Sequence, residues 1–223
     1  IDNAIVGESA TNILEQCYVQ GSDAACGRFT RGSNGQVSSL DRSLVNAGYR
    51  ETAGYDINVR YRLLETAFGK SAVNWNTTYT DYLEQRNDSA ATTPVEQRTG
   101  WAGDFRVRST FNLDWQYGDL GIGWTARYYS SMKEKCSYMD ECNMPGFNSS
   151  YTSASPTNKV GSNNFHDLQV RYSLPWDGTV SLGVNNVFNH QGPIMYSQPN
   201  SSFTYYGGFD IGRFMYMKYQ QRF

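Results

Sequence analysis

The segment from Asp104 to Tyr117 constrains the fold more than any other part of the chain. Two sets of side chains alternate along it without interruption. One set is Phe105, Val107, Ser109, Phe111, Leu113, Trp115 and Tyr117, and the other is Asp104, Arg106, Arg108, Thr110, Asn112, Asp114 and Gln116. A period of two indicates a β-strand with one apolar and one polar face. The segment exceeds the roughly 9 to 11 residues that cross a bilayer as a tilted strand.

The same alternation recurs in other parts of the chain. Apolar residues take every second position within 55–63, 73–80, 120–129, 167–174, 180–184 and 213–223. In the last of these, Met215, Met217 and Tyr219 share one face with Gln221, and the opposite face is mostly polar. A strand that is apolar on one side sets that side against a protein core or against lipid. About seven such strands are expected, after an end-of-strand pattern at residues 1–6.

The connections between these strands alternate in length. Short turns are expected at residues 65–69, at Gly118-Asp119 and at residues 175–178. Long polar segments occupy residues 86–100, 133–164 and 189–207. Outer-membrane barrels show this asymmetry, with short periplasmic turns and long extracellular loops. The pattern favours an all-β fold, an antiparallel transmembrane β-barrel.

Composition excludes several other classes of protein. The chain is 39% hydrophobic, has a mean hydropathy of -0.60 and contains no run of about 20 apolar residues, which excludes transmembrane helices. Its 17 Tyr, 11 Phe and 5 Trp suit the aromatic girdles of a barrel, but a secreted β-sandwich has a similar average. A net charge of -2 and the lack of any basic run argue against nucleic acid as a partner.

The four cysteines form two close pairs, Cys17 with Cys26 and Cys136 with Cys142. Zinc sites use closer spacing and commonly histidine, and both histidines, His166 and His190, lie far from either pair. Two local disulfides in an oxidising compartment are the favoured interpretation, with free thiols as the alternative. Each short loop closed this way is stabilised by about 2 to 3 kcal/mol.

Two segments near the C-terminus resemble the last two strands of TonB-dependent receptors. They are GVNNVFNHQGP, from Gly183 to Pro193, and DIGRFMYMKYQQRF, from Asp210 to Phe223. The positions on the family pattern are Asn185, Asn186, Phe188, Gly212, Arg213 and Phe223. Lys218 and Gln221 differ from the Gly and the aromatic residue that are common there. The resemblance implies that Tyr219 and Phe223 belong to the signal read by the barrel-assembly machinery.

The resemblance also implies an organisation for the whole chain. Residues 1–35 resemble an extracellular disulfide-clipped loop, and residues 36–223 the C-terminal strands of a larger barrel of about 22 strands with a plugged lumen. Counting strands back from Phe223 puts residue 1 on the extracellular side, so a fragment is expected, since complete barrels have both termini in the periplasm.

The function implied is active uptake across the outer membrane of a Gram-negative bacterium. A scarce ligand, such as a ferric siderophore, a vitamin or an oligosaccharide, would bind the loops and the plug. TonB would act through the plug domain, which has no counterpart in this sequence, and lipid would surround the wall. The implied protein is a transporter without a cofactor, rather than an enzyme.

Candidate site residues come from the loops and the polar faces. Loop aromatics suited to stacking on a ligand are Tyr138, Phe147, Tyr151, Tyr196, Phe203, Tyr205 and Tyr206. The arginines on the inward face are suited to an anionic ligand; they include Arg60, Arg62, Arg106, Arg108 and Arg127. The alternative role for them is an ion pair with an inward carboxylate, such as Asp56, Asp104 or Asp114. The sequence contains no motif that pairs a catalytic nucleophile with a general base, and no metal-binding motif. His166 and His190 are expected at the surface or in the aromatic girdle.

Two other functions remain open at this point. A small stand-alone outer-membrane barrel, an adhesin or a passive pore, predicts an even number of strands and a closed seam between the first and the last. A soluble secreted lectin-like β-sandwich predicts that Val107, Phe111, Leu113 and Trp115 pack against a second sheet of the same chain.

Overall fold

The structure, a computed structural model, describes residues 2–86, 95–135, 157–193, 195, 205–208 and 211–222. The chain forms two compact units. Unit 1 contains residues 1–53 and 82–98, and unit 2 contains residues 54–81 and 99–223. Within the described residues, no helix has both the length and the apolar character needed to cross a membrane.

Unit 1 is built from short elements. They are β1 (Asp2–Val6), α1 (Ala10–Tyr18), α2 (Asp23–Cys26), β2 (Phe29–Arg31), β3 (Val37–Leu40) and β6 (Glu96–Gln97), with parts of β4 (Val45–Arg62) and β5 (Lys70–Arg86). β1 pairs with β4 from Val45 to Tyr49, β2 pairs with β3, and β6 pairs with Glu84 and Gln85. The strand expected at the start of the chain is therefore present.

The two helices of unit 1 differ from the sequence expectation, which placed no regular element in this segment. Serine side chains begin both helices: Ser9 accepts a hydrogen bond from the backbone of Asn12 at 3.1 Å, and Ser22 accepts one from Ala25 at 3.4 Å. Such caps satisfy backbone N–H groups that have no partner inside the helix. With nine and four residues, the helices are too short to show a clear period of 3.6.

A disulfide and a buried charge hold unit 1 together. Cys17 and Cys26 are bonded, as predicted, with their Cα atoms 4.8 Å apart, and they border a small core of Ile13, Ala25, Phe29 and Leu40. The buried Glu8 carboxylate accepts a hydrogen bond from Gln16 at 3.0 Å and pairs with Arg28. Pairing is what permits a carboxylate to be buried, because an isolated buried charge is very costly.

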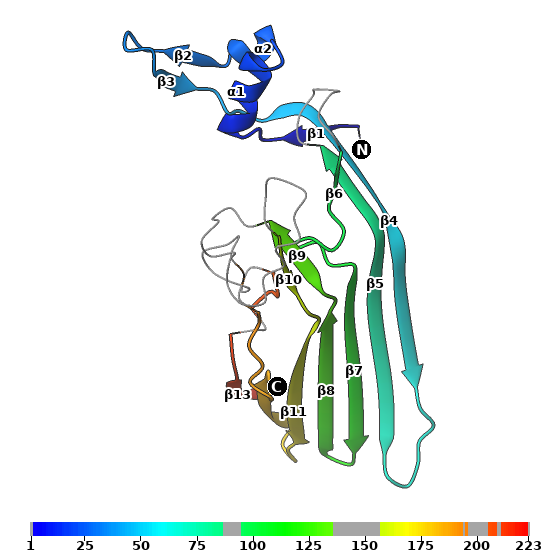
Figure 1. Ribbon diagram of the computed structural model, residues 1–223. Helices are drawn as coiled ribbons and strands as arrows, with labels where there is room; N and C mark the ends of the chain where they lie inside the picture. The colour runs from blue at the N-terminus through cyan, green and yellow to red at the C-terminus, as the bar shows by residue number, and fades with distance from the viewer. Residues whose placement is uncertain are drawn as a thin grey trace. The chain divides into compact units, whose positions relative to one another are not determined.

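Unit 2 is dominated by one antiparallel sheet (Figure 1). Its strands pair in the order β4, β5, β7 (Val107–Tyr117), β8 (Leu120–Tyr129), β11 (Asn163–Ser173), β12 (Gly178–Asn185) and β13 (Phe214–Gln221). These seven strands pair in their order along the chain, as in a meander, with β6 inserted between β5 and β7, and with β9 and β10 inserted between β8 and β11. Short connections join β4 to β5, β7 to β8 and β11 to β12, and long ones alternate with them, as predicted.

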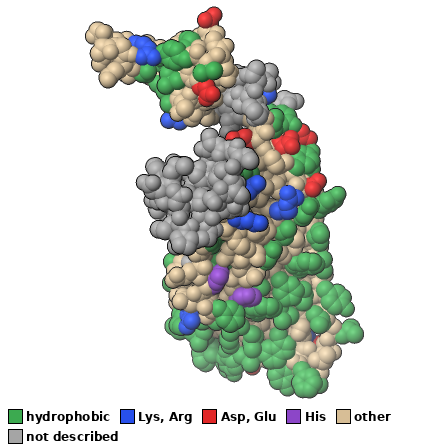
Figure 2. All heavy atoms as spheres, in the orientation of Figure 1, with side chains coloured by type: hydrophobic (Ala, Val, Ile, Leu, Met, Phe, Trp, Pro, Cys, Tyr) green, Lys and Arg blue, Asp and Glu red, His purple; other side chains and the backbone are tan. Residues whose placement is uncertain are grey.

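The register of the sheet confirms the predicted division into two faces. On one face, Trp115 lies opposite Ile122, and Ile122 opposite Val170. The next row of that face contains Leu113, Trp124, Leu168, Val184 and Met215. Residues of the other parity, such as Asp114, Gln169 and Arg171, share the opposite face. Figure 2 shows hydrophobic side chains covering the strands on the face that it draws.

The apolar face has no second sheet against it in the described part of the chain. Leu182, Met215 and Met217 are 57%, 67% and 73% exposed, and Val107, Phe111, Leu113 and Trp115 are only half-buried. An apolar surface this continuous marks a membrane or partner interface. The sandwich alternative required a covering sheet. Among the described strands, β13 also forms no seam with β1 or β4, which is the pairing that the stand-alone barrel predicted.

A core forms at the long-loop end of unit 2. Phe105, Met132, Val160, Phe165, Met195 and Tyr206 are all buried there, and Tyr129 packs against them. Phe165 and Tyr129 have the parity of the polar face, so this core lies on the inner side of the sheet. The expectation that Phe105 shares the outward face with Val107 was wrong. It precedes β7, where the ladder no longer sets its direction, and it packs on Tyr129 and Tyr206 with ring centroids 5.1 and 5.5 Å away.

A two-stranded element lies within the segment expected to be the loop 133–164. β9 (Met132–Lys135) pairs with β10 (Thr157–Val160), and β11 already begins at Asn163. Met132 and Val160 lie opposite each other and point into the core. Because only four residues on each strand alternate, the sequence signal was too short to separate this element from its polar surroundings.

Candidate functional site

The polar face of unit 2 is the candidate site, and its rows run across the strands. One row contains Ala72, Asp114, Gly123, Gln169, Gly183 and Tyr216. The next row toward the short turns contains Lys70, Gln116, Gly121, Arg171, Ser181 and Lys218. Glycines alternate with large polar residues, so the long side chains lie along the wall over their neighbours.

Two ion pairs connect strands on this face. Arg127 on β8 pairs with Asp167 on β11, and both side chains are mostly buried. Arg171 on β11 pairs with Asp114 on β7 across β8, where both side chains are more exposed. The Arg171 guanidinium passes over Gly121, where an added Cβ would lie 3.2 Å from its Nε. Glycine at this position leaves room for the pair to cross the intervening strand.

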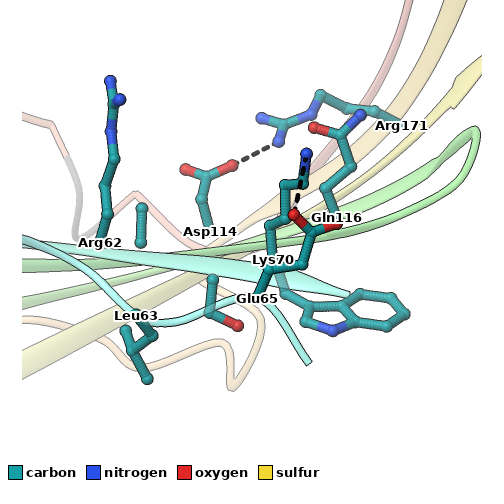
Figure 3. A pocket seen from close by; sticks show the side chains of 10 residues that line it. Arg62, Leu63, Glu65, Lys70, Asp114, Gln116 and Arg171 are labelled. Atoms are coloured by element: carbon teal, nitrogen blue, oxygen red, sulfur yellow. Dashed lines mark hydrogen bonds and ion pairs between the residues drawn. The ribbon is translucent and has the colours of Figure 1, made fainter. Parts of the chain in front are cut away.

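A hollow of about 400 Å³ opens at the short-turn end of the polar face. Figure 3 shows Asp114 facing Arg171, and Lys70 beside Glu65, while Arg62 stands apart from both pairs. Lys70 Nζ lies 3.4 Å from Glu65 Oε2. The Arg62 side chain forms no hydrogen bond or ion pair with another described residue. The hollow therefore presents one unpaired guanidinium beside two neutralised pairs, an arrangement suited to a carboxylate or another anion.

A second hollow of about 230 Å³ lies between the two ion pairs. Its lining includes Thr125, Gln169, Asn185 and Tyr216 in addition to the paired charges. Gln169 donates a hydrogen bond to the Tyr216 hydroxyl at 2.9 Å. These groups can donate and accept hydrogen bonds from a polar solute. Among the described residues, no cluster of side chains is suited to hold a metal ion.

Three of the arginines predicted to meet a ligand, Arg106, Arg108 and Arg127, have different surroundings. Arg127 is engaged by Asp167, and Arg106 donates to the backbone carbonyl of Asp81 at 3.0 Å. Arg108 lies on the polar face opposite Thr78 and Tyr129. Its side chain is exposed and forms no hydrogen bond or ion pair with another described residue. The expected partners also differ: Asp114 pairs with Arg171, and Asp56 accepts from the Thr78 hydroxyl at 2.7 Å.

The loop aromatics are only partly placed. Tyr206 is fully buried in the core, so its expected exposure to a ligand was wrong. Tyr205 is half-buried and packs against that core. The other candidates, Tyr138, Phe147, Tyr151, Tyr196 and Phe203, lie outside the described residues, as do Cys136, Cys142 and Phe223. Tyr219 is 53% exposed on the apolar face of β13.

The two histidines differ in exposure, since His166 is half-buried and His190 is exposed. His166 stacks on Trp124 with ring centroids 5.7 Å apart and contacts the edge of Phe188. His190 Nε2 lies 2.8 Å from Asn163 Oδ1, and Asn163 in turn donates to the Tyr206 hydroxyl at 2.9 Å. Within the described residues, neither ring lies beside a nucleophilic side chain.

The asparagines of the segment from Gly183 to Pro193 shape the chain after β12. Asn186 and Asn189 have positive φ values of 49° and 54°, a conformation that asparagine tolerates better than most residues. The Asn186 side chain bonds the backbone of His190 in both directions, at 2.9 and 2.7 Å. The Asn189 side chain accepts from the backbone of Arg213 at 2.9 Å, so this motif fixes where β13 begins.

Sequence reasoning did not single out Asp167, Gln169, Arg171 and Tyr216. Their polar parity was visible, but the partners of Arg127 and Arg171 lie 40 and 57 residues away. The order of the strands in the sheet brings these groups together, because it sets β11 beside β8 and one strand away from β7. A search for opposite charges of equal parity on different strands is the signal that would have found them.

Comparison with known proteins identifies a family for the chain. A family model described as the TonB dependent receptor-like β-barrel matches residues 1–187. No curated protein matches the chain. The matched part includes unit 1 and the strands of unit 2 as far as the end of β12.

Proposed function

The chain belongs to the TonB-dependent receptor family through its β-barrel, and we propose that the polar face of unit 2 lines the entry route of a scarce ligand. Members of this family are non-enzymatic transporters of the Gram-negative outer membrane that work with TonB. The proposed ligand is a ferric siderophore, a vitamin or an oligosaccharide. TonB would act through a plug, and Tyr219 and Phe223 would form the signal for barrel assembly.

The observation that supports this route is the strict separation of the two faces. The rows of the register that contain Trp115 and Leu113 continue with apolar or small side chains on the neighbouring strands, and the row of Phe111 contains Trp75, Ala126 and His166. The rows between them contain the paired charges and both hollows. A polar solute can follow such a wall while keeping hydrogen bonds in place of its water.

Arg108 is the ligand contact that we propose first. It points to the polar side near the long loops and, within the described chain, has no partner that a ligand would need to displace. Arg127 is a weaker candidate because removing it from Asp167 would leave a mostly buried carboxylate unpaired. Tyr205 is the described loop aromatic that we keep as a ligand contact.

Uptake assays test the proposal. Cells carrying the protein should accumulate one class in a panel of labelled ferric chelates, vitamins and oligosaccharides, and accumulation should stop when TonB is deleted. Equal uptake with and without TonB would contradict active import. Passive entry of all small solutes would point to a pore instead.

A matched pair of variants tests the binding residue. Arg108→Ala should weaken binding of the identified ligand about fivefold to tenfold, as expected for one charge-assisted contact. Lys218→Ala removes an exposed cation from the same face at the short-turn end and should leave affinity unchanged. If Arg108→Ala binds like the wild type, the assignment of Arg108 fails while TonB-dependent uptake still stands.

A further inference from the structure

Two lysines lie directly opposite each other on the β9–β10 pair. The register places Lys133 against Lys159, and both are exposed. Like charges at directly opposed positions of an antiparallel pair destabilise it. Stability of the strand pair therefore does not explain this arrangement.

No acidic side chain of the described chain neutralises these lysines. Neither ammonium forms an ion pair with a described carboxylate. Lys133 Nζ instead lies 4.5 Å from the centre of the Trp101 ring. A cation–π contact of this kind orients the ammonium without cancelling its charge, so two adjacent positive charges remain available to a partner.

The two lysines point away from the core at the long-loop end of unit 2. Met132 and Val160, their neighbours on the same strands, are buried in the core that contains Phe165. That core lies on the polar, inner side, so Lys133 and Lys159 have the opposite direction because side chains alternate along a strand. In Figure 2, Lys and Arg side chains gather on the face that carries the apolar band, just above that band.

We propose that Lys133 and Lys159, with Trp101, bind phosphate groups on lipid headgroups of the outer leaflet. The site lies at the long-loop end, next to the apolar surface that contacts acyl chains. Phosphate is an anion that compact ammonium groups bind as point charges, and an indole suits the boundary between headgroups and acyl chains. A solute inside the lumen would not reach this side of the wall, which is why a lipid is the partner proposed.

Lipid binding by the purified protein tests the site. The probe is detergent-solubilised lipid A carrying both phosphates, and the measurement is its dissociation constant from the intact protein. The double variant Lys133→Gln/Lys159→Gln should bind roughly thirtyfold more weakly, from the contribution expected for each lysine near an anionic headgroup. Dephosphorylated lipid A should bind wild type and variant equally weakly.

The control is the double variant Lys70→Gln/Lys218→Gln. These lysines are also exposed, but they lie on the polar face at the short-turn end, and this variant should bind like the wild type. Heat-modifiable migration in gels shows that each variant is folded. Equal losses in both double variants would reduce the effect to net charge and overturn the proposal. Inorganic phosphate binding as tightly as the lipid would overturn a headgroup site.

Discussion

The ring of Tyr216 lies directly on the backbone of Gly183 on the neighbouring strand. A Cβ added at position 183 would come within 2.1 Å of Tyr216 Cζ, and the two residues are paired in the β12–β13 register. The ring lies flat only because position 183 has no side chain. In this position, the Tyr216 hydroxyl reaches Gln169 on the next strand but one.

Gly183→Ala should therefore displace Tyr216 and break its hydrogen bond with Gln169. We expect a loss of about 1 to 3 kcal/mol in unfolding free energy from overpacking, measured by urea titration in lipid vesicles. Gly161→Ala is the control, because nothing lies within 4 Å of an added Cβ there. Equal effects of the two substitutions would contradict this role for Gly183.

Ser109 should be needed to hydrogen-bond the polar groups of Trp75 and Thr77 on the lipid-facing side of the sheet. Its Oγ lies 2.7 Å from both Trp75 Nε1 and Thr77 Oγ1. Without water in the bilayer core, Ser109→Ala leaves the indole N–H without a partner and should cost about 1 to 2 kcal/mol. Ser71 lies on β5, on the same face of the sheet as Ser109, and Ser71→Ala should be nearly neutral. Both variants are measured by urea unfolding in lipid vesicles. A neutral Ser109→Ala would count against the interpretation.

The two ion pairs of the polar face should differ in strength. Asp167 and Arg127 are 15% and 19% exposed, whereas Asp114 and Arg171 are 50% and 37% exposed. Asp167→Asn should cost about 2 kcal/mol because it leaves a mostly buried guanidinium without its counter-charge. Asp114→Asn should cost less than about 1 kcal/mol. Urea unfolding of both variants is the measurement, and a larger loss for Asp114→Asn would contradict the ranking.

The Cys17–Cys26 disulfide should stabilise unit 1 locally. Replacing both cysteines with alanine removes a constraint worth about 2 to 3 kcal/mol. Backbone amides of α1 and α2 should then exchange hydrogen faster, by roughly a hundredfold where exchange follows opening of this unit. Exchange within β7 and β8 should stay unchanged and serves as the internal control. Unchanged protection of α1 would show that the core of Ile13 and Phe29 suffices alone.

The charge of Asp41 should make the stability of a surface turn depend on pH. Hydrogen bonds from the Ser43 side chain and backbone lower the pKa of Asp41 below its ordinary value of 3.8. A lowered folded-state pKa stabilises the folded state above the ordinary value, and the contribution is lost as pH falls through the folded pKa. Carboxyl NMR titration should show that Ser43→Ala raises the pKa toward 3.8. An unchanged titration would exclude the hydroxyl as the main cause.

Much of the wall could be predicted, and the reason is local. The alternation around Phe111 assigned a face to each residue of β7, and the same parity placed Met215 and Met217 on the exposed side of β13. Helix α1 was missed although Ile13, Gln16 and Cys17, its buried residues, have helical spacing. Nine residues give too few turns for that spacing to stand out against a polar background.

The partners on the polar face could not be predicted in the same way. Arg127 and Arg171 were visible as inward residues, but their carboxylates come from other strands, and Tyr206 was expected at the surface. Its burial depends on Phe105, Tyr129 and Phe165, which three separate segments bring together.

By itself, the sequence determined which residues of the regular strands share the apolar face and which share the polar face, because side chains alternate between the two faces along a strand. The tertiary structure decided which lumen charges neutralise each other, where the loops form a core and which cations stay free. Those outcomes depend on strand register and on distances between segments far apart in sequence, and no local pattern encodes them.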